Sequence, residues 1–138
     1  GSDSDYDVAV LKIDAKDLPA VTLGSSTDVN VGDTVLAIGN PLGLGLAISS
    51  GIIGSTAHEL DRYALPCIVN SADISRGSSG GALLNTHGQV IAVTSGAYTY
   101  GNNMYLAVPV DPVMAADLTV SGWTLKEVKA IEAAKDKD

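Results

Sequence analysis

Short apolar segments separated by turn sequences recur about every ten residues along most of this chain. Valine and isoleucine are frequent in these segments, phenylalanine is absent, and 15 glycines supply residues for tight turns. Many short strands at this spacing are typical of an antiparallel barrel or sandwich. The sequence therefore predicts an all-β fold.

The apolar pattern predicts a series of strands followed by a helical region. The first expected strand is a nearly continuous apolar run, which is typical of a strand buried on both faces. Residues 58–62 and 95–103 are expected in loops. After Asp111 the pattern changes, because Pro112 fits the first turn of a helix and apolar residues recur at helical spacing over 124–131. The expected strands cover residues 7–13, 29–39, 47–53, 67–69, 82–84, 89–94 and 104–110.

The composition limits the classes of partner. A net charge of −8 and a pI of about 4.4, without any basic stripe, argue against a nucleic-acid partner. An apolar fraction of 46% allows a core without disulfides, and no metal or cofactor is expected. The single cysteine, Cys67, excludes an internal disulfide and lies in an apolar run, so we expect a buried thiol. No apolar stretch reaches the roughly 18 residues of a membrane span.

Residues 77–81 read Gly-Ser-Ser-Gly-Gly and lie between two of the expected strands. Small residues let the backbone turn sharply around Ser79 and leave its hydroxyl exposed. The backbone N–H groups of Gly77 and Ser79 can then point into one space, which is how an oxyanion hole is built beside a nucleophile. The alternative is a plain Gly/Ser turn between two strands.

Several segments, in matching order and spacing over about residues 7–111, resemble the trypsin-like serine proteases of the HtrA/DegP-like family. The resemblance implies two six-stranded β-barrels with the active site in the cleft between them. We therefore expect this chain to form the second barrel, an antiparallel six-stranded one, followed by a C-terminal α-helix. The matching segments are DVAVLKID (7–14), VGDTVLAIGNPLGL (31–44), ISSGII (48–53), ADISRGSSGGALLN (72–85), GQVI (88–91) and YLAVPV (105–110).

The resemblance implies a catalytic role for three residues. Ser79 is the expected nucleophile, Gly77 and Ser79 supply the oxyanion-hole amides, and Asp7 is the carboxylate that orients the catalytic histidine. A serine hydroxyl is a poor nucleophile until an imidazole takes its proton, and that imidazole needs a fixed tautomer. Taken alone, Asp7 also fits a strand-start cap in a run of acidic residues. Ser78 stands where the family commonly has asparagine, a small polar exchange that keeps the turn possible.

The resemblance also implies substrate-binding residues. Asp73 lies six residues before the nucleophile, the offset at which trypsin-like enzymes carry the acid that selects arginine or lysine. With its neighbour Ile74 it is expected at the substrate pocket, although this family usually favours small apolar side chains there. Ser95, Gly96 and Ala97 match the strand edge that pairs with substrate beside the pocket. Free backbone N–H and C=O groups at such an edge suit an extended peptide.

The sequence contains two histidines, His58 and His87, whereas the family's catalytic histidine lies upstream of the Asp7 segment. Either could swing toward Ser79, but both are expected to be surface loop residues. We therefore expect a fragment that is inactive alone. Its uncovered apolar surface is expected to bind the missing N-terminal barrel or a second copy, as a homo-oligomer or strand-exchanged dimer. The expected divisions are a start segment with the last strand of the first barrel (1–14), the second barrel (15–111), and a helix with a charged tail (112–138).

The function implied by the resemblance is that of a bacterial serine endopeptidase acting on unfolded or regulatory polypeptides in protein quality control. Ser79 would attack the peptide carbonyl and form an acyl-enzyme. The family suggests an extracytoplasmic or cell-envelope location. The alternative is a protease-like barrel that binds peptides or proteins without catalysis. A nucleotide site in the loop 39–45 is a poorer interpretation, because no Lys-Ser/Thr pair follows and no helix begins there.

Overall fold

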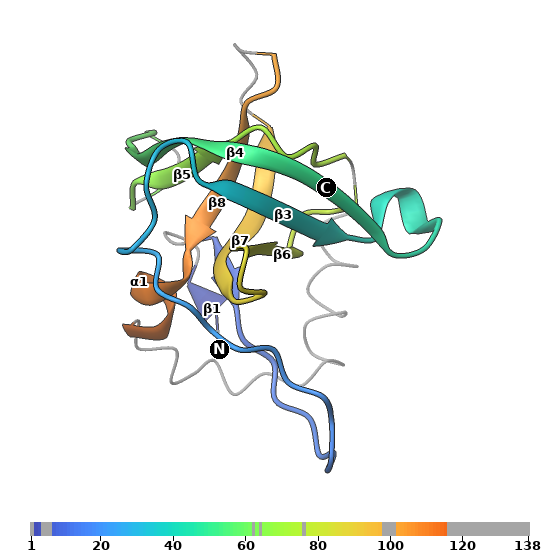
Figure 1. Cartoon of the computed structure of the whole chain (residues 1–138). Coiled ribbons are helices and arrows are strands. Elements are labelled where there is room, and N and C mark those ends of the chain that lie inside the picture. The colour runs from blue at the N-terminus through green and yellow to red at the C-terminus, as the bar shows by residue number, and fades with distance from the viewer. Residues whose placement is uncertain are drawn as a thin grey trace, which may run out of the picture.

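Six antiparallel strands close into a barrel in the computed structural model of this chain (Figure 1). The structure describes residues 2–3, 7–61, 63, 65–75, 77–97 and 102–115. A short 3-10 helix, η1 (Pro41–Gly43), connects β3 to β4, and the helix α1 (Val110–Ala115) follows β8. The barrel strands are β3 (Thr34–Gly39), β4 (Ala47–His58), β5 (Cys67–Asn70), β6 (Ala82–Leu84), β7 (Val90–Ala97) and β8 (Tyr105–Pro109).

The barrel closes because β6 pairs with β3, with Leu84 opposite Leu36. The order of strands around it is β3-β4-β5-β8-β7-β6. Alternate side chains of a barrel strand point inward, and Val35 and Ala37 on β3 are buried accordingly. The predicted all-β, closed six-stranded fold with a short C-terminal helix is thus confirmed. The largest fully buried side chains are Ile53, Ile68, Leu83 and Ile91.

The start of the chain differs from its predicted strand. β2 (Val8–Ala9) pairs with β1 (Ser2–Asp3). The predicted strand therefore ends at Ala9, and residues 10–20 belong to no strand. Leu11 and Ile13 are 86% and 68% exposed, so the prediction of a strand over residues 7–13 buried on both faces is wrong. An apolar run is buried on both faces only where neighbouring layers cover it, and residues 10–20 project away from the barrel (Figure 1). The expectation of uncovered apolar surface in this segment is confirmed.

Two strands extend beyond their predicted ends. His58, expected in a loop, is the last residue of β4 and lies opposite Cys67 of β5. Residues 95–97, also expected in a loop, belong to β7 and pair with β8. β4 is long because register shifts after Ile53 and Ser55 let it bend around the barrel while it pairs with both neighbours.

Asp111, in the first turn of α1, fastens the helix to the loop before β3. Its carboxylate accepts hydrogen bonds from the Ser26 hydroxyl at 2.6 Å, from the Ser26 backbone N–H, and from the Ser25 hydroxyl at 3.2 Å. These bonds lower the pKa of the Asp111 carboxyl, the Ser26 hydroxyl contributing most, because they favour the ionised form. The helical pattern over 124–131 lies outside the described residues. Within the described part of the chain, no helix has the length and apolar character to cross a membrane.

Substitution of Asp111 by asparagine should remove part of the acid sensitivity of the fold. The pKa of this carboxyl is lowered on folding, so its contribution to stability is present above the unfolded value of about 4 and is lost as the pH falls through the folded value. We expect the urea midpoint of the wild type to decrease more steeply between about pH 5 and pH 2 than that of Asp111→Asn. Asp28→Asn removes the same charge from the neighbouring loop and is the control. Identical pH dependence in wild type and Asp111→Asn would contradict this assignment.

Candidate active site

The segment between β5 and β6 turns sharply at residues 77–81 and presents Ser79 to solvent. Ser79 is exposed, whereas Ser78 is 9% exposed. The Ser78 carbonyl accepts hydrogen bonds from the Gly81 N–H at 3.0 Å and from the hydroxyl of buried Thr94 at 2.6 Å. These bonds close the turn and fix it to β7. Only one of the two adjacent hydroxyls is therefore available for chemistry.

Close approach of this turn to β3 and η1 explains its small residues. Gly77 has a φ of 97°, and a Cβ at this position would lie 2.9 Å from the carbonyl oxygen of Asn40. A Cβ on Gly81 would lie 2.2 Å from the carbonyl oxygen of Ile38. Residues with side chains rarely adopt such a φ or tolerate such a contact. The backbone geometry thus requires glycine at both positions.

Two N–H groups of the turn lack an acceptor in the described structure. The N–H groups of Ser78, Gly80 and Gly81 donate to backbone carbonyls. Among the described residues, no acceptor is found for the N–H of Gly77 or of Ser79. Free donors beside an exposed hydroxyl are what a developing oxyanion needs. The oxyanion hole itself stays a prediction.

Ser95, near the end of β7, connects Ser79 with Asp7. The Ser79 hydroxyl donates to the backbone carbonyl of Ser95 at 2.6 Å. The Ser95 hydroxyl donates to Oδ2 of Asp7, also at 2.6 Å. Asp7, from the start of the described chain, and Ser79, from the turn before β6, therefore both contact the same residue of β7.

Asp7 reaches this position from a left-handed backbone conformation, with φ 53°, which aspartate tolerates better than most residues. Its charge also affects Cys67, whose thiol pKa is raised first by burial and second by the Asp7 carboxylate. Cys67 is 1% exposed. A buried thiol that stays protonated is not a nucleophile, and the expected buried cysteine is confirmed.

The described hydrogen bonds of the Ser79 hydroxyl and the Asp7 carboxylate involve no histidine. His87 is exposed in the turn between β6 and β7, at the opposite end of β7 from Ser95. His58 ends β4 and lies across from β5. The Ser95 carbonyl orients the Ser79 proton but cannot accept it, so this bond alone does not activate the serine.

The predicted pocket residues Asp73 and Ile74 have different surroundings. Asp73 is exposed, and its backbone carbonyl accepts a hydrogen bond from the Ser49 hydroxyl at 2.6 Å. Hydrogen bonding with the Asp73 carboxylate is the main cause that raises the pKa of Tyr105, at the start of β8. The Ile74 side chain is 7% exposed and belongs to the barrel core. Only the backbone of Ile74 is therefore left to contact a substrate.

Residues 95–97 form a strand edge beside Ser79. On one side, Gly96 and Ala97 pair with β8. On the other side, pairing of β7 with β6 stops at Val93, so in the described structure no strand covers that side of residues 95–97. This edge lies where the sequence predicted substrate pairing.

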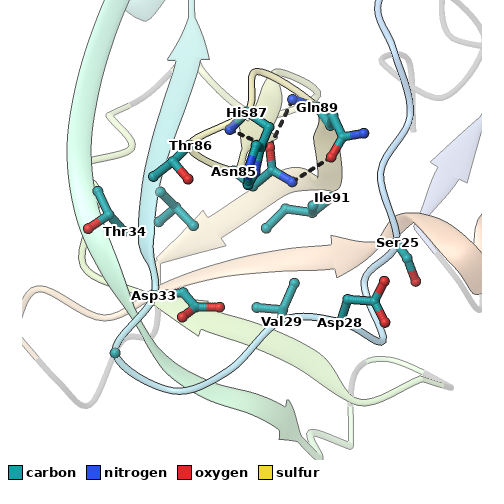
Figure 2. A pocket seen from close by; sticks show the side chains of 12 residues that line it. Ser25, Asp28, Val29, Asp33, Thr34, Asn85, Thr86, His87, Gln89 and Ile91 are labelled. Atoms are coloured by element: carbon teal, nitrogen blue, oxygen red, sulfur yellow. Dashed lines mark hydrogen bonds between the residues drawn. The ribbon is translucent and has the colours of Figure 1, made fainter.

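A cavity of about 600 Å³ lies away from Ser79, at the other end of β7 (Figure 2). Asp28 and Asp33 lie on one side of it, and Asn85 and Gln89 lie across from them in the turn between β6 and β7. A cavity of about 220 Å³ is closer to the nucleophile turn, and Asp73 and Ser78 are among its lining residues. Across the described ranges, no three His, Cys, Asp or Glu side chains are grouped so that they could hold a metal ion.

Three side chains that support the site were not foreseen from the sequence. Thr94 fixes the nucleophile turn, and the Tyr63 hydroxyl lies 2.8 Å from Oγ of Ser95. Asn70, which is 1% exposed, donates to the Tyr105 carbonyl at 3.2 Å and accepts from the Ala72 N–H at 3.0 Å. Asn70 follows the apolar residues of β5, and Thr94 follows the apolar first half of β7. A polar residue beside an apolar run is the sequence signal that could have identified them, because buried polar groups are nearly always hydrogen-bonded.

Comparison with known sequences gives one family. A family model for the trypsin-like peptidase domain matches residues 1–93. A protein from Halomonas elongata named "Probable periplasmic serine endoprotease DegP-like" is 42% identical over 118 residues, covering 83% of this chain and 25% of that protein. A protein of the same name from Pseudomonas savastanoi pv. phaseolicola is 41% identical over 129 residues, covering 88% and 27%. The chain thus spans about a quarter of the length of these relatives.

Solved structures agree with the sequence comparison. The structure titled "HtrA-type protease AlgW with decapeptide" matches with a TM-score of 0.77 and 38% identity, covering 83% of this chain and 37% of that one. The serine endoprotease from Yersinia pestis matches with a TM-score of 0.70 and 35% identity, covering 83% and 40%. Sequence and fold therefore agree that the chain belongs to the trypsin-like peptidase family, in its HtrA/DegP-like branch.

Proposed function

We propose that this chain carries the nucleophile of an HtrA-like serine endopeptidase. The observation that carries the proposal is the exposed Ser79 hydroxyl, joined through Ser95 to the Asp7 carboxylate by two hydrogen bonds of 2.6 Å. The N–H groups of Gly77 and Ser79, which have no described acceptor, lie in the same turn. Family membership supplies the reaction class for this arrangement.

The steps follow from these groups. Oγ of Ser79 attacks the peptide carbonyl carbon while an imidazole accepts its proton, and the Gly77 and Ser79 N–H groups stabilise the charge on the carbonyl oxygen. The imidazolium returns the proton to the leaving amine, which leaves an acyl-enzyme on Ser79 that water hydrolyses. Asp7 orients the imidazole, which the histidine-bearing first barrel of the full-length product supplies. These steps use no cofactor.

The proposed substrate is an extended polypeptide. Its backbone pairs with the uncovered edge of residues 95–97, as strand addition requires free N–H and C=O groups. Two related AlgW structures are titled with a decapeptide and a tripeptide, which supports this class of ligand. Asp73 is the candidate residue for selecting arginine or lysine before the cleaved bond, and the backbone of Ile74 lies beside it.

Partners and location are proposed on the same grounds. Val10, Leu11 and Ile13 are 46%, 86% and 68% exposed, which suits packing against a first barrel or against a second copy. The relatives named above are described as periplasmic, and we place the full-length product in the periplasm.

A fluorophosphonate probe tests the proposed function. In the full-length gene product, we expect covalent labelling at Ser79, located by mass spectrometry of the labelled peptide. The 138-residue chain alone should label far more slowly, because the Ser79 hydroxyl there donates to a carbonyl and not to a base. Absence of labelling in the folded full-length product would contradict the protease assignment and favour a peptide-binding barrel without catalysis.

A further inference from the structure

Tyr63 is a buried aromatic residue whose hydroxyl points toward the site. Its side chain is 8% exposed and packs in a cluster that includes Cys67, Leu106, Val108 and Val113. A tyrosine buried in apolar surroundings needs a hydrogen-bond partner for its hydroxyl. The Ser95 hydroxyl is one such partner, at 2.8 Å.

The direction of these hydrogen bonds follows from the single proton that each hydroxyl group can donate. At neutral pH an ionised carboxylate only accepts, so the bond of 2.6 Å between Ser95 and Asp7 uses the one proton of the Ser95 hydroxyl. The Ser95 oxygen is then an acceptor toward Tyr63. The phenol donates to Ser95, and Ser95 donates to Asp7, in a chain with a single direction.

We propose that Tyr63 is a positioning residue, which acts through Ser95 on both Asp7 and Ser79. This inference rests on the proposed protease function. The bond from Tyr63 fixes the side-chain rotamer of Ser95, and donation to an oxygen that itself donates strengthens the second bond. The same residue, Ser95, offers its backbone carbonyl to the Ser79 hydroxyl. Tyr63 therefore orients the side chain that donates to the acid, on the residue whose carbonyl accepts the hydrogen bond of the nucleophile.

Phenylalanine at position 63 separates this role from packing. Tyr63→Phe keeps the ring in its apolar cluster and removes only the hydroxyl that contacts Ser95. Val113→Ala is the matched packing control, because Val113 is 8% exposed in the same cluster and carries no polar group. Ser95→Ala removes the hydroxyl through which Tyr63 acts.

In the full-length product, Tyr63→Phe should lower kcat about fivefold with KM nearly unchanged, as expected for one hydrogen bond to a neutral group. In the Ser95→Ala background the same substitution should have a much smaller effect on kcat, because the hydroxyl through which Tyr63 acts on Asp7 is already absent. Val113→Ala should lower stability and leave kcat unchanged in the folded protein. Equal kcat in Tyr63→Phe and wild type, or independent effects of Tyr63→Phe and Ser95→Ala that multiply, would overturn the proposal.

A measurement on the 138-residue chain keeps this test separate from protease activity. The Hα–Hβ couplings of Ser95 report its χ1 angle by NMR. We expect one rotamer in wild type and in Val113→Ala, and averaged couplings in Tyr63→Phe. Unchanged couplings in Tyr63→Phe would overturn the positioning role. The two hypotheses can also fail separately. If the Ser95 couplings are averaged in Tyr63→Phe but fluorophosphonate does not label the full-length product, the positioning role is supported and the protease function is rejected.

Discussion

Substitution of Ser79 by alanine in the full-length product should lower kcat for peptide hydrolysis by about a millionfold and leave KM nearly unchanged. The substrate still meets the strand edge at residues 95–97 and the N–H groups of the turn, so binding persists. Without Oγ of Ser79, no acyl-enzyme forms, and only the smaller effect of the oxyanion donors and of binding is left. Steady-state kinetics with a fluorogenic peptide, together with titration of active sites, measure this loss.

The adjacent serine is the matched control for this experiment. Ser78 is 9% exposed and lies against Gly39, so its hydroxyl is much less accessible than that of exposed Ser79. Ser78→Ala should keep kcat within about tenfold of wild type, because its backbone carbonyl still accepts the bonds from Gly81 and Thr94. If Ser79→Ala kept more than about one hundredth of the activity, or if Ser78→Ala were the inactive variant, Ser79 would not be the nucleophile.

Gly51→Ala should cost more than about 4 kcal/mol of unfolding free energy, or prevent folding altogether. A Cβ on Gly51 would lie 2.1 Å from the backbone nitrogen of Ala72 and 2.5 Å from the carbonyl carbon of Ser71. Both contacts are backbone atoms, and Ala72 is fully buried, so no side-chain rotation can relieve them. Relief requires moving β4 away from the start of the nucleophile segment, where the Ser71 N–H donates to the Ile52 carbonyl at 3.0 Å.

Gly54→Ala makes the same chemical change three residues further along β4 and is the control. A Cβ on Gly54 would meet its nearest neighbour, the Val69 carbonyl oxygen, at an ordinary 3.7 Å. We expect a change in unfolding free energy below about 1 kcal/mol for this variant. Urea unfolding followed by far-UV circular dichroism compares the two. Similar losses in both variants would show that the backbone contact at Gly51 is not the cause.

The barrel could be predicted from the sequence because its strands alternate with turn sequences, and the core faces of β3, β5 and β7 are read directly from their apolar residues. The exposed position of the start of the chain could not be predicted in this way. The residues at 10–13 would suit a buried strand as well as an exposed segment. Leu11 is exposed because no layer covers it in the described structure. Burial of such a segment depends on its neighbours and not on its own composition.

The candidate site also has parts that the sequence suggested and parts that depend on the fold. Ser79 was proposed as the nucleophile from its glycine-flanked turn, whereas the role of Asp7 was only implied by the resemblance of its segment to the family. The contacts of Ser95 with both residues depend on how β7 lies between β6 and β8, and no local pattern contains that information. Tyr63 is harder still, since it lies in an irregular connection before β5 and reaches Ser95 only through the fold.

The projecting segment of residues 10–20 has a consequence for the lifetime of the site. This segment joins Asp7 to the barrel that holds Ser79, and exposed chain is where proteolytic nicking concentrates. After one such nick, the acid would be retained by the contact with Ser95 and by Val8 against the Tyr63 cluster, with the covalent connection on that side severed. How long the acid stays beside the serine thus depends on how well those few residues are shielded from other proteases.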